Sequence, residues 1–397
     1  MTARTTYVGE HRPSGEVVRA ARRRHPTAGS RRRPKRPPAP LAFWALVLTM
    51  GVLTLLGLVM VLSSSSVMAI HQDSSGWAYF QRQSLCAVIG LVALVVALKV
   101  PVTLWRRLVP LALAASFGLM VVTLVAGRSV NGARAWLDVG PFGFQPSEMV
   151  KFALLLYGAD LLARRVDRMG DAHATLRPYV IVLLGGAGLS VLQRDLGSAI
   201  VMAAIVMAVA FIGGAPIIPM AKTAVGLAAG GLVFVVSTPY RRARWTSFLN
   251  LTSHKQGSGL QVWQSLIGIA SGGVTGAGLG ASKAKWGYLP EAHTDFIFAI
   301  IAEELGLVGV IVVVSLFLLL GFFGVQVALH APDRFSMLLA GGVTAWLLVQ
   351  AFINIACVVG MMPLTGLTLP FVSFGGTSLL VTMSAAGLLL NVARSAR

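Results

Sequence analysis

The chain has 397 residues, of which 56% are hydrophobic and only 12% are charged. This composition lies outside the range of soluble globular proteins and indicates a polytopic membrane protein. The net charge of +19 does not indicate nucleic-acid binding, because Lys and Arg fall mainly in an amino-terminal arm and between apolar runs. Cys86 and Cys357 both lie in apolar segments, so we expect neither a disulfide nor a thiolate metal site.

Residues 1–40 form a basic arm with few apolar side chains, and its cations cluster at residues 22–24 and 31–36. Since such a segment cannot bury a core, we expect it to be disordered. Two roles fit a cytoplasmic arm of this kind. It can fix the orientation of the protein and contact anionic lipid, or it can dock an acidic partner.

Ten apolar segments follow the arm, and a span needs about 20 apolar residues to cross the hydrocarbon core. Their approximate cores are residues 41–62, 84–100, 106–126, 147–162, 178–193, 197–213, 217–237, 296–329, 335–358 and 376–393. We expect no cleavable signal peptide before the first. With the arm inside, both termini are cytoplasmic and the inner connections carry the Lys and Arg that this orientation favours. The sequence predicts an all-α polytopic membrane domain of ten spans over residues 41–397.

Two of the predicted outer connections are unusual. Residues 127–147, between the third and fourth spans, are rich in turn formers and in Arg and aromatic residues that suit a membrane interface. Residues 238–294, between the seventh and eighth spans, form a large extracytoplasmic loop that is too long for an ordinary connection. Its amphipathic segment 262–270 and Gly-rich segment 271–280 are expected to lie on or dip into the outer leaflet. No strand precedes Gly276–Gly280, so we interpret this run as a tight-packing segment rather than a dinucleotide loop.

Cations gather at the predicted outer face, against the direction that membrane topology favours. They are Arg128, Arg134, Arg194, Arg241, Arg242, Arg244, Lys255, Lys283 and Lys285. One interpretation is that these are solvated side chains of loops that cross the membrane regardless of charge. The other is that they bind an anionic ligand, and the diphosphate headgroup of a lipid fits them well.

Residues 289–306 place four carboxylates and a histidine at the start of the eighth span, where ionisable groups are costly and usually functional. Thr294 suits a helix N-cap, which puts Asp295 in the first turn at the outer mouth. An apolar wall and a bound phosphate would raise the pKa of Asp295 towards that of a general base. Helical geometry turns Glu303 and Glu304 away from it. We expect these two to pair with buried polar groups of other spans, leaving Asp295 as the one candidate base.

Three other candidates each allow two interpretations. Glu148 and Lys151 lie three apart at the start of the fourth span, where they form either a helical ion pair or a ligand site. Asp195 either pairs with cations near Arg194 or caps the sixth span. His293 beside Asp295 suggests a metal or a catalytic dyad, yet the sequence has no second histidine at ligand spacing and no HExxH or CxxC motif.

Five segments together resemble the signatures of the SEDS family (shape, elongation, division and sporulation). They are residues 131–136 (NGARAW), 145–151 (QPSEMVK), 195–199 (DLGSA), 288–306 (YLPEAHTDFIFAIIAEELG) and 363–376 (PLTGLTLPFVSFGG). They occur in order along the whole predicted membrane domain. The sequence of the large loop, at residues 240–250 and 257–261, is more similar to that of division members of the family than to that of elongation members.

The resemblance implies a peptidoglycan glycosyltransferase that polymerises lipid II, a disaccharide peptide linked to undecaprenyl diphosphate, at the outer face of the bacterial cytoplasmic membrane. It implies that Asp295 is catalytic and that the protein acts at the division septum. The implied partners are a class B penicillin-binding transpeptidase and other division membrane proteins. One base fits this chemistry, because a diphosphate is a good leaving group once cations balance its charge. A divalent cation such as Mg²⁺ could share that charge, although the sequence shows no cage for it.

The substrate-binding candidates from these motifs and loops are Arg134, Glu148, Lys151, Asp195, Arg244, Gln264, Ser265, Lys285, Glu291, His293, Thr294 and Ser373. The chain departs from the family pattern at Arg194 and Leu251, where Pro is usual, and at Leu260, where Tyr is usual. We therefore expect differences in the bend before the sixth span and in the large loop.

Two other functions compete with polymerisation. A lipid II flippase should keep ionisable groups and broken helices near the midplane of the membrane, with inverted halves. The polar residues of this chain are instead biased to the predicted outer side, and no internal repeat is visible. A non-catalytic division scaffold would not need Asp295 at all.

Overall fold

The computed structural model describes residues 2, 40–71, 75–130, 132–140, 142–237, 239–251 and 257–396. The chain divides into two units, Met1–Pro38 and Ala39–Arg397, and the helices and strands described below all lie in the second. Apart from Thr2 and Pro40, the basic arm lies outside the described residues, so its disorder stays a prediction.

Ten helices correspond one to one with the ten expected spans. They are α1 (Leu41–His71), α2 (Ala78–Lys99), α3 (Val102–Ala126), α4 (Pro146–Arg164), α5 (Leu176–Leu192), α6 (Leu196–Ile212), α7 (Ile217–Val236), α10 (Ile297–Leu329), α11 (Arg334–Val358) and α12 (Gly376–Ser395). Within the described ranges, all of them except α4, α5 and α6 are long and apolar enough to cross a membrane. The class of an all-α polytopic membrane protein is confirmed, whereas the number of spans and their sidedness stay predictions.

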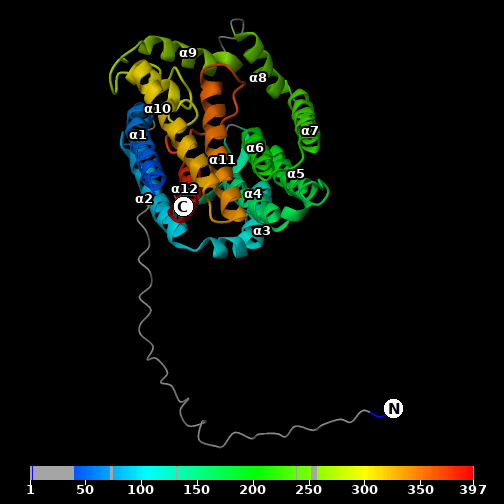
Figure 1. Ribbon diagram of the computed structural model, residues 1–397. Helices are drawn as coiled ribbons and strands as arrows, with labels where there is room; N and C mark the ends of the chain where they lie inside the picture. Colours follow the sequence, from blue (N-terminus) through cyan, green and yellow to red (C-terminus); the bar gives the residue numbers. More distant parts are fainter. Residues whose placement is uncertain are drawn as a thin grey trace, which may run out of the picture. The chain divides into compact units, whose positions relative to one another are not determined.

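The helices pack around α11 and α12. The apolar stretches of these two helices are 72% and 83% buried, whereas that of α7 is 6% buried and lies at the periphery (Figure 1). Small residues allow close helix approach, as at Gly158 on α4, where an added Cβ would lie 2.1 Å from the ring of Tyr179 on α5. The Tyr179 hydroxyl donates to the carbonyl of Leu154 at 3.1 Å, which satisfies it inside the apolar core.

The connection between α3 and α4 forms a small antiparallel sheet, which the sequence analysis did not predict. Its strands are β1 (Arg128–Val130), β2 (Ala133–Val139) and β3 (Phe142–Phe144), in that order. Strands this short show little periodicity in sequence. Tertiary bonds hold the sheet: the amide of Arg134 donates to the carbonyl of Gln193 at 3.0 Å, and Thr377 on α12 donates to the carbonyl of Gly143 at 3.2 Å.

The large loop between α7 and α10 contains α8 (Pro239–Leu249) and α9 (Leu260–Gly272). Short 3₁₀ turns occupy Gly257–Gly259 just before α9 and Val166–Arg168 after α4. Helix α9 confirms the expected amphipathic segment, and it packs against α10 and α11 at one end of the helix group (Figure 1). We call this end, which also carries the small sheet and Asp295, the loop end.

Helix α10 is broken at Gly306, whose φ of 64° and ψ of −159° are not helical. The Gly-rich segment 273–278 lies along the break and takes the backbone hydrogen bonds that the helix cannot make. The bonds are Ala277 N to Glu303 O at 2.9 Å, Gly278 N to Glu304 O at 3.0 Å, Leu307 N to Gly273 O at 3.0 Å and Val308 N to Val274 O at 3.3 Å. Backbone groups in a membrane protein must find such partners, which explains why irregular segments pair here. Within the run Gly276–Gly280, the expected tight packing is confirmed at Gly276, whereas a Cβ added at Gly278 would meet no atom within 4 Å.

Candidate active site

Asp295 lies just before α10, not in its first turn. The helix begins at Ile297, and Phe296 is its N-cap without a side-chain hydrogen bond. The prediction that Thr294 caps the helix is wrong, because its hydroxyl donates to the carbonyl and the carboxylate of Glu291 at 3.1 and 2.9 Å. The fully buried ring of Phe296 anchors the cap position in the core instead.

The Asp295 residue is held by its backbone. Nδ2 of Asn354 on α11 donates to the carbonyl of Asp295 at 2.8 Å and to that of Leu367 at 2.6 Å. The carboxylate faces the segment before α12, since a Cβ added at Gly366 would lie 3.6 Å from Oδ2 of Asp295. As a whole residue, Asp295 is half-buried at the loop end.

Burial raises the pKa of the Asp295 carboxyl to about 7. The charges of Glu291 and Asp195 add to this rise, while the guanidinium of Arg244 opposes it. The direction agrees with the sequence prediction, but two neighbouring carboxylates supply part of the cause. Burial also lowers the pKa of His293, against the effect of Glu291. A carboxyl with a pKa near neutrality is suited to act as a general base.

A second carboxylate, that of Glu291, acts on Asp295. Glu291 takes a left-handed backbone conformation, with φ of 57°, and its side chain accepts from Thr294. This turn brings its charge close enough to act on Asp295. The sequence pattern predicted the start of a helix at Thr294 and gave no sign of the left-handed turn at Glu291.

Asp195 serves as the N-cap of α6, which confirms one of its two interpretations. Its Oδ1 accepts from the amide of Ser198 at 3.0 Å, and its Oδ2 accepts from Gln145 Nε2 and Ser147 Oγ, both at 3.0 Å. Both carboxylate oxygens of Asp195 therefore already accept hydrogen bonds from the protein. The charge of Asp195 also acts on Asp295, and a substrate role for Asp195 stays a prediction.

The bend before Asp195 takes a backbone conformation that proline cannot adopt. Arg194 has a φ of 65°, whereas the ring of a proline holds φ near −65°. One amino group of Arg194 donates to the carbonyl of Gly132 at 3.4 Å, so the arginine also contacts the connection between β1 and β2.

The predicted outer cations occupy different places. Arg244, on α8, is half-buried and lines a small hollow with Met362 and Pro363, and its charge acts on Asp295. Arg134, on β2, is exposed. Lys285 is not an exposed cation, since it is buried and forms an ion pair with Glu304 at 3.3 Å. Of these three, the structure associates Arg244 with Asp295, and a substrate role for each stays a prediction.

Glu148 and Lys151 form a buried ion pair at 2.7 Å, which confirms the helical pairing. Lys151 also donates to Oε1 of Gln350 at 3.2 Å, and Gln350 donates to the carbonyl of Thr368 at 3.0 Å. Oε2 of Glu148 is buried and has no hydrogen-bond partner among the described residues. The pair thus connects α4 through α11 to the segment before α12, and a ligand role stays a prediction.

Glu303 and Glu304 differ from each other in their partners. Glu304 accepts from Ser63 on α1 at 2.7 Å, as expected for a residue that pairs with another span. Glu303 instead accepts from the loop at residues 282–284. The prediction that both acids pair with other spans is therefore wrong for Glu303, because the loop folds into the helix group beside the break in α10.

Most of the remaining candidates contact backbone groups of neighbouring segments. The His293 ring packs edge-on against Tyr79, with ring centres 4.9 Å apart, and its carbonyl accepts from Phe374 N at 2.9 Å. Ser373 Oγ accepts from Leu369 N at 2.8 Å. On α9, Ser265 donates to the carbonyls of Val262 and Val358, both at 2.8 Å, and Gln264 is half-buried beside it. Within the described ranges, no group of three or more His, Cys, Asp or Glu is placed to hold a metal ion.

Sequence reasoning missed Asn354 and Gln350. Both are buried on α11, one helical turn apart, and both bond the segment that faces Asp295. The available signal was the presence of two amide side chains four apart within an otherwise apolar span, where polar groups are usually functional or paired.

Comparison with known proteins extends this picture. Residues 43–397 match the model of a family described as cell cycle protein and named for FtsW, RodA and SpoVE. The chain belongs to this family. It is the SEDS family that the sequence motifs indicated, and the match covers the whole helical domain described above.

Curated relatives in the FtsW/RodA/SpoVE family include both division and sporulation members. The chain is 40% identical over 359 residues to the probable peptidoglycan glycosyltransferase FtsW of Geobacter sp. (strain M18), covering 89% of this chain and 97% of that one. It is 39% identical over 355 residues to FtsW of Mycobacterium tuberculosis, covering 89% and 68%. Stage V sporulation protein E of Bacillus subtilis is 37% identical over 354 residues, covering 89% and 96%.

Solved structures of FtsW/RodA/SpoVE proteins share the fold. A chain from a peptidoglycan synthase complex, described as coordinating polymerization and crosslinking, superposes with a TM-score of 0.72 at 32% identity. RodA of Thermus thermophilus superposes with a TM-score of 0.66 at 30% identity. Both alignments cover 89% of this chain and 97% of the other.

Proposed function

We propose that this protein is a peptidoglycan glycosyltransferase that polymerises lipid II at the outer face of the bacterial cytoplasmic membrane during cell division. The observation that carries the proposal is the state of Asp295. This carboxyl has a pKa near 7, belongs to a half-buried residue and lies within the electrostatic reach of Arg244. The curated FtsW relatives are named as probable peptidoglycan glycosyltransferases, which supports this chemistry over other uses of a base.

In the proposed reaction, Asp295 takes the proton from a sugar hydroxyl of the acceptor. The freed oxygen forms a glycosidic bond to the anomeric carbon of the donor, while the bond from that carbon to the diphosphate breaks. The lipid diphosphate leaves with the electron pair, and the proton on Asp295 passes to solvent. A single base is sufficient because the leaving group needs no proton once cations balance its charge.

Arg244 is the cation best placed to balance the diphosphate, since it lines a hollow beside Met362 and acts on Asp295. A guanidinium suits this task because its fork of donors matches phosphate oxygens. Arg134 at the edge of the small sheet is a second candidate. A divalent cation shared between phosphate oxygens and the loop carboxylates remains a prediction.

The proposed partners are a class B penicillin-binding transpeptidase and other division membrane proteins at the septum. The neighbouring solved chain belongs to a peptidoglycan synthase complex, which supports a partner that crosslinks the strands. The basic arm is proposed to contact anionic lipid or an acidic partner at the cytoplasmic side.

The test is polymerisation of lipid II by purified protein with its transpeptidase. Asp295→Asn keeps the size of the side chain and the backbone bond from Asn354, so the fold is retained. We expect glycan synthesis to fall by a factor of about 10² to 10⁴, the usual contribution of general base catalysis. Asp138→Asn removes an acid at an exposed position of strand β2 and should polymerise normally. Full activity of Asp295→Asn would refute the proposal, and division supported by that variant in cells would indicate a scaffold.

A flippase is the second candidate, because the break in α10 and the buried acids beside it are features that transporters also use. Vesicles that hold lipid II only in the inner leaflet separate the two functions. Movement of the headgroup to the outer leaflet without polymer would favour transport. Polymer formed from lipid II supplied outside, without any movement, favours the glycosyltransferase.

A further inference from the structure

Two sequence motifs that the proposed reaction does not use meet at the break in α10. Gly276 and Gly306 have φ values of 82° and 64° and face each other in close contact. A Cβ at Gly276 would lie 2.1 Å from the carbonyl oxygen of Glu304, and a Cβ at Gly306 would lie 2.3 Å from the amide nitrogen of Gly276. Neither position accepts a side chain. The backbone of the loop at Gly276 therefore lies directly against the backbone of α10 at Gly306. We call segments 273–285 and 303–308 together the α10 latch.

Glu303 closes the latch from the helix side. Its Oε2 accepts from Ser282 Oγ at 2.5 Å and from Ala284 N at 3.3 Å, and its Oε1 accepts from Lys283 N at 2.8 Å. Its side chain is buried. Both carboxylate oxygens are therefore used to hold one short stretch of the loop.

Glu304 joins the latch to α1. It accepts from Ser63 Oγ at 2.7 Å, from Ser282 N at 3.3 Å and from Lys285 Nζ at 3.3 Å. Lys285 in turn donates to the carbonyl of Gly280 at 2.6 Å. The buried ammonium of Lys285 thus pairs with Glu304, whereas Glu303 is held by hydroxyl and backbone donors of the loop. Separating the loop from α10 would leave these buried charges without partners, which is costly. The hydrogen-bonded arrangement is therefore the stable one.

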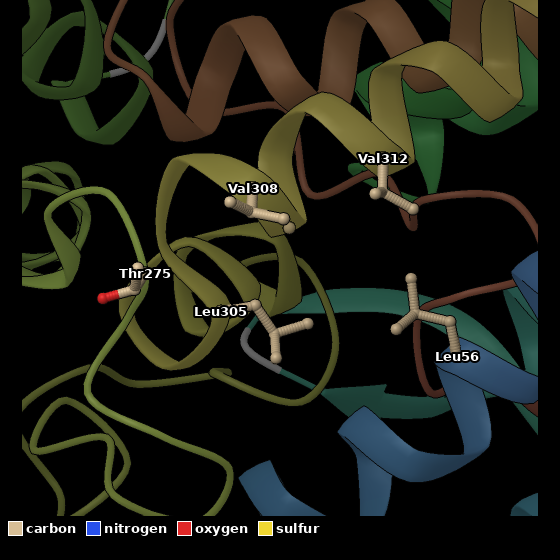
Figure 2. Close-up of a pocket in the computed structure, with 6 residues that line it drawn as sticks. Leu56, Thr275, Leu305, Val308 and Val312 are labelled. Carbon is tan, nitrogen blue, oxygen red and sulfur yellow. The ribbon is translucent and has the colours of Figure 1, made fainter.

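One side of the latch borders an open hollow. The hollow has a volume of about 380 Å³, lies between α1 and α10 (Figure 2), and is lined by Leu56, Thr275, Leu305, Val308, Gly309 and Val312. Figure 2 shows Thr275, from the latch loop, across from Leu56 on α1. The loop therefore has free volume beside Thr275, while its hydrogen bonds to α10 hold the neighbouring residues.

The latch closes a ring of chain that contains Asp295. Segment 284–303 leaves the latch, passes through Asp295 and the first turns of α10, and returns to the latch at Glu303. The carbonyl of Ala284 accepts from Leu289 N at 2.9 Å, which stiffens the outgoing arm. We propose that Glu303 is a positioning residue of the glycosyl transfer, acting by clamping residues 282–284 so that the segment carrying Asp295 keeps one position. This inference rests on the proposed function.

The first test is Glu303→Gln in the full-length protein with its transpeptidase. Glutamine has the same shape but only one acceptor oxygen, and its NH₂ group faces a loop donor in either orientation. We expect kcat for lipid II polymerisation to fall at least about tenfold while KM changes less than about twofold, since misplaced catalytic groups lower turnover. Amide hydrogen exchange in segment 284–296 should become faster. A role in folding alone would lower the yield of folded protein and leave its kcat unchanged.

A glycine pair supplies the matched control. Gly276 and Gly214 have φ values of 82° and 80°, so alanine causes similar backbone strain at both. Only Gly276→Ala places a Cβ against the backbone of Glu304, whereas a Cβ at Gly214, between α6 and α7 and outside the latch, would meet no atom within 4 Å. Gly276→Ala should reproduce the loss of kcat and the faster exchange of segment 284–296, while Gly214→Ala should polymerise at a rate close to that of the unmodified protein.

The outcomes separate this inference from the proposed function. If the unmodified protein makes no glycan, the proposed function fails, and the positioning role falls with it. Slow amide exchange in segment 284–296 would not rescue the positioning role in that case. If the unmodified protein makes glycan and Glu303→Gln does so at the same kcat, the positioning role is overturned. Loss of kcat with unchanged exchange in segment 284–296 also overturns it, because Glu303 would then act by another route.

Discussion

The side chain of Asn354 holds Asp295 by its backbone, with Nδ2 donating to the Asp295 carbonyl at 2.8 Å. The same NH₂ group donates to the carbonyl of Leu367 at 2.6 Å. The amide orientation is fixed, because the opposite one would place Oδ1 against two carbonyl oxygens. Helix α11 therefore joins Asp295 to the segment that its carboxylate faces.

Replacing Asn354 should separate these two segments. We expect Asn354→Leu to lower the rate of glycan synthesis at least about tenfold, since a small displacement of a catalytic group is costly. It should also lower the free energy of unfolding by about 1–3 kcal/mol, because two buried carbonyls lose their donor. Single-turnover polymerisation and thermal unfolding in detergent measure the two effects. An unchanged rate would show that Asp295 does not depend on this bond.

The pH dependence of polymerisation should follow the ionisation of Asp295. A general base must be ionised, and the raised pKa of about 7 keeps this carboxyl protonated at lower pH. The rate should therefore rise with pH and reach half its maximum near pH 7. Glu291→Gln removes a charge that raises the pKa, so its midpoint should move to lower pH. Arg244→Gln removes the opposing charge, so its midpoint should move to higher pH. Equal midpoints in all three proteins would assign the titration to another group.

The buried pair on α4 should be strongly coupled in stability. Lys151→Met leaves Glu148 charged and buried without its partner, which should lower the free energy of unfolding by about 3–5 kcal/mol. Glu148→Gln combined with Lys151→Met should recover much of that loss, because no unpaired charge remains. Unfolding of the three variants in detergent gives the coupling. Additive losses would mean that the 2.7 Å ion pair is not energetically significant.

A pair of helical glycines should respond to alanine with opposite signs. Gly158→Ala places a Cβ 2.1 Å from the Tyr179 ring, so it should lower the free energy of unfolding by about 1–3 kcal/mol through overpacking. Gly188→Ala on α5 meets no atom within 4 Å and should raise it by up to about 1 kcal/mol through helix propensity. Thermal unfolding compares the two, and a tolerated Gly158→Ala would show that α4 and α5 move apart easily.

Much of the fold could be predicted because apolar runs of span length are a strong signal, and each expected span is a helix. The small sheet could not, because β1 to β3 are short and held by bonds to distant residues such as Gln193 and Thr377. The break at Gly306 was also hidden, since the apolar pattern continues through it. Only the approach of segment 273–278 reveals why a glycine is required there.

The candidate site was predictable where neighbours in sequence act together. Local spacing indicated the ion pair of Glu148 with Lys151 and the capping role of Asp195, each beside an alternative, and the structure shows both. The turn that returns Glu291 towards Asp295 depends on a left-handed residue, which sequence spacing does not show. The bond from Asn354 to Asp295 joins residues far apart along the chain, so it could be found only from the structure.

The hollow between α1 and α10 bears on which substitutions this part of the chain tolerates. Its lining is apolar except for Thr275, and it adjoins the loop that enters the broken helix (Figure 2). Because the hollow leaves free volume beside Thr275, a larger apolar residue at that position is accommodated without the strain that overpacking causes in the core.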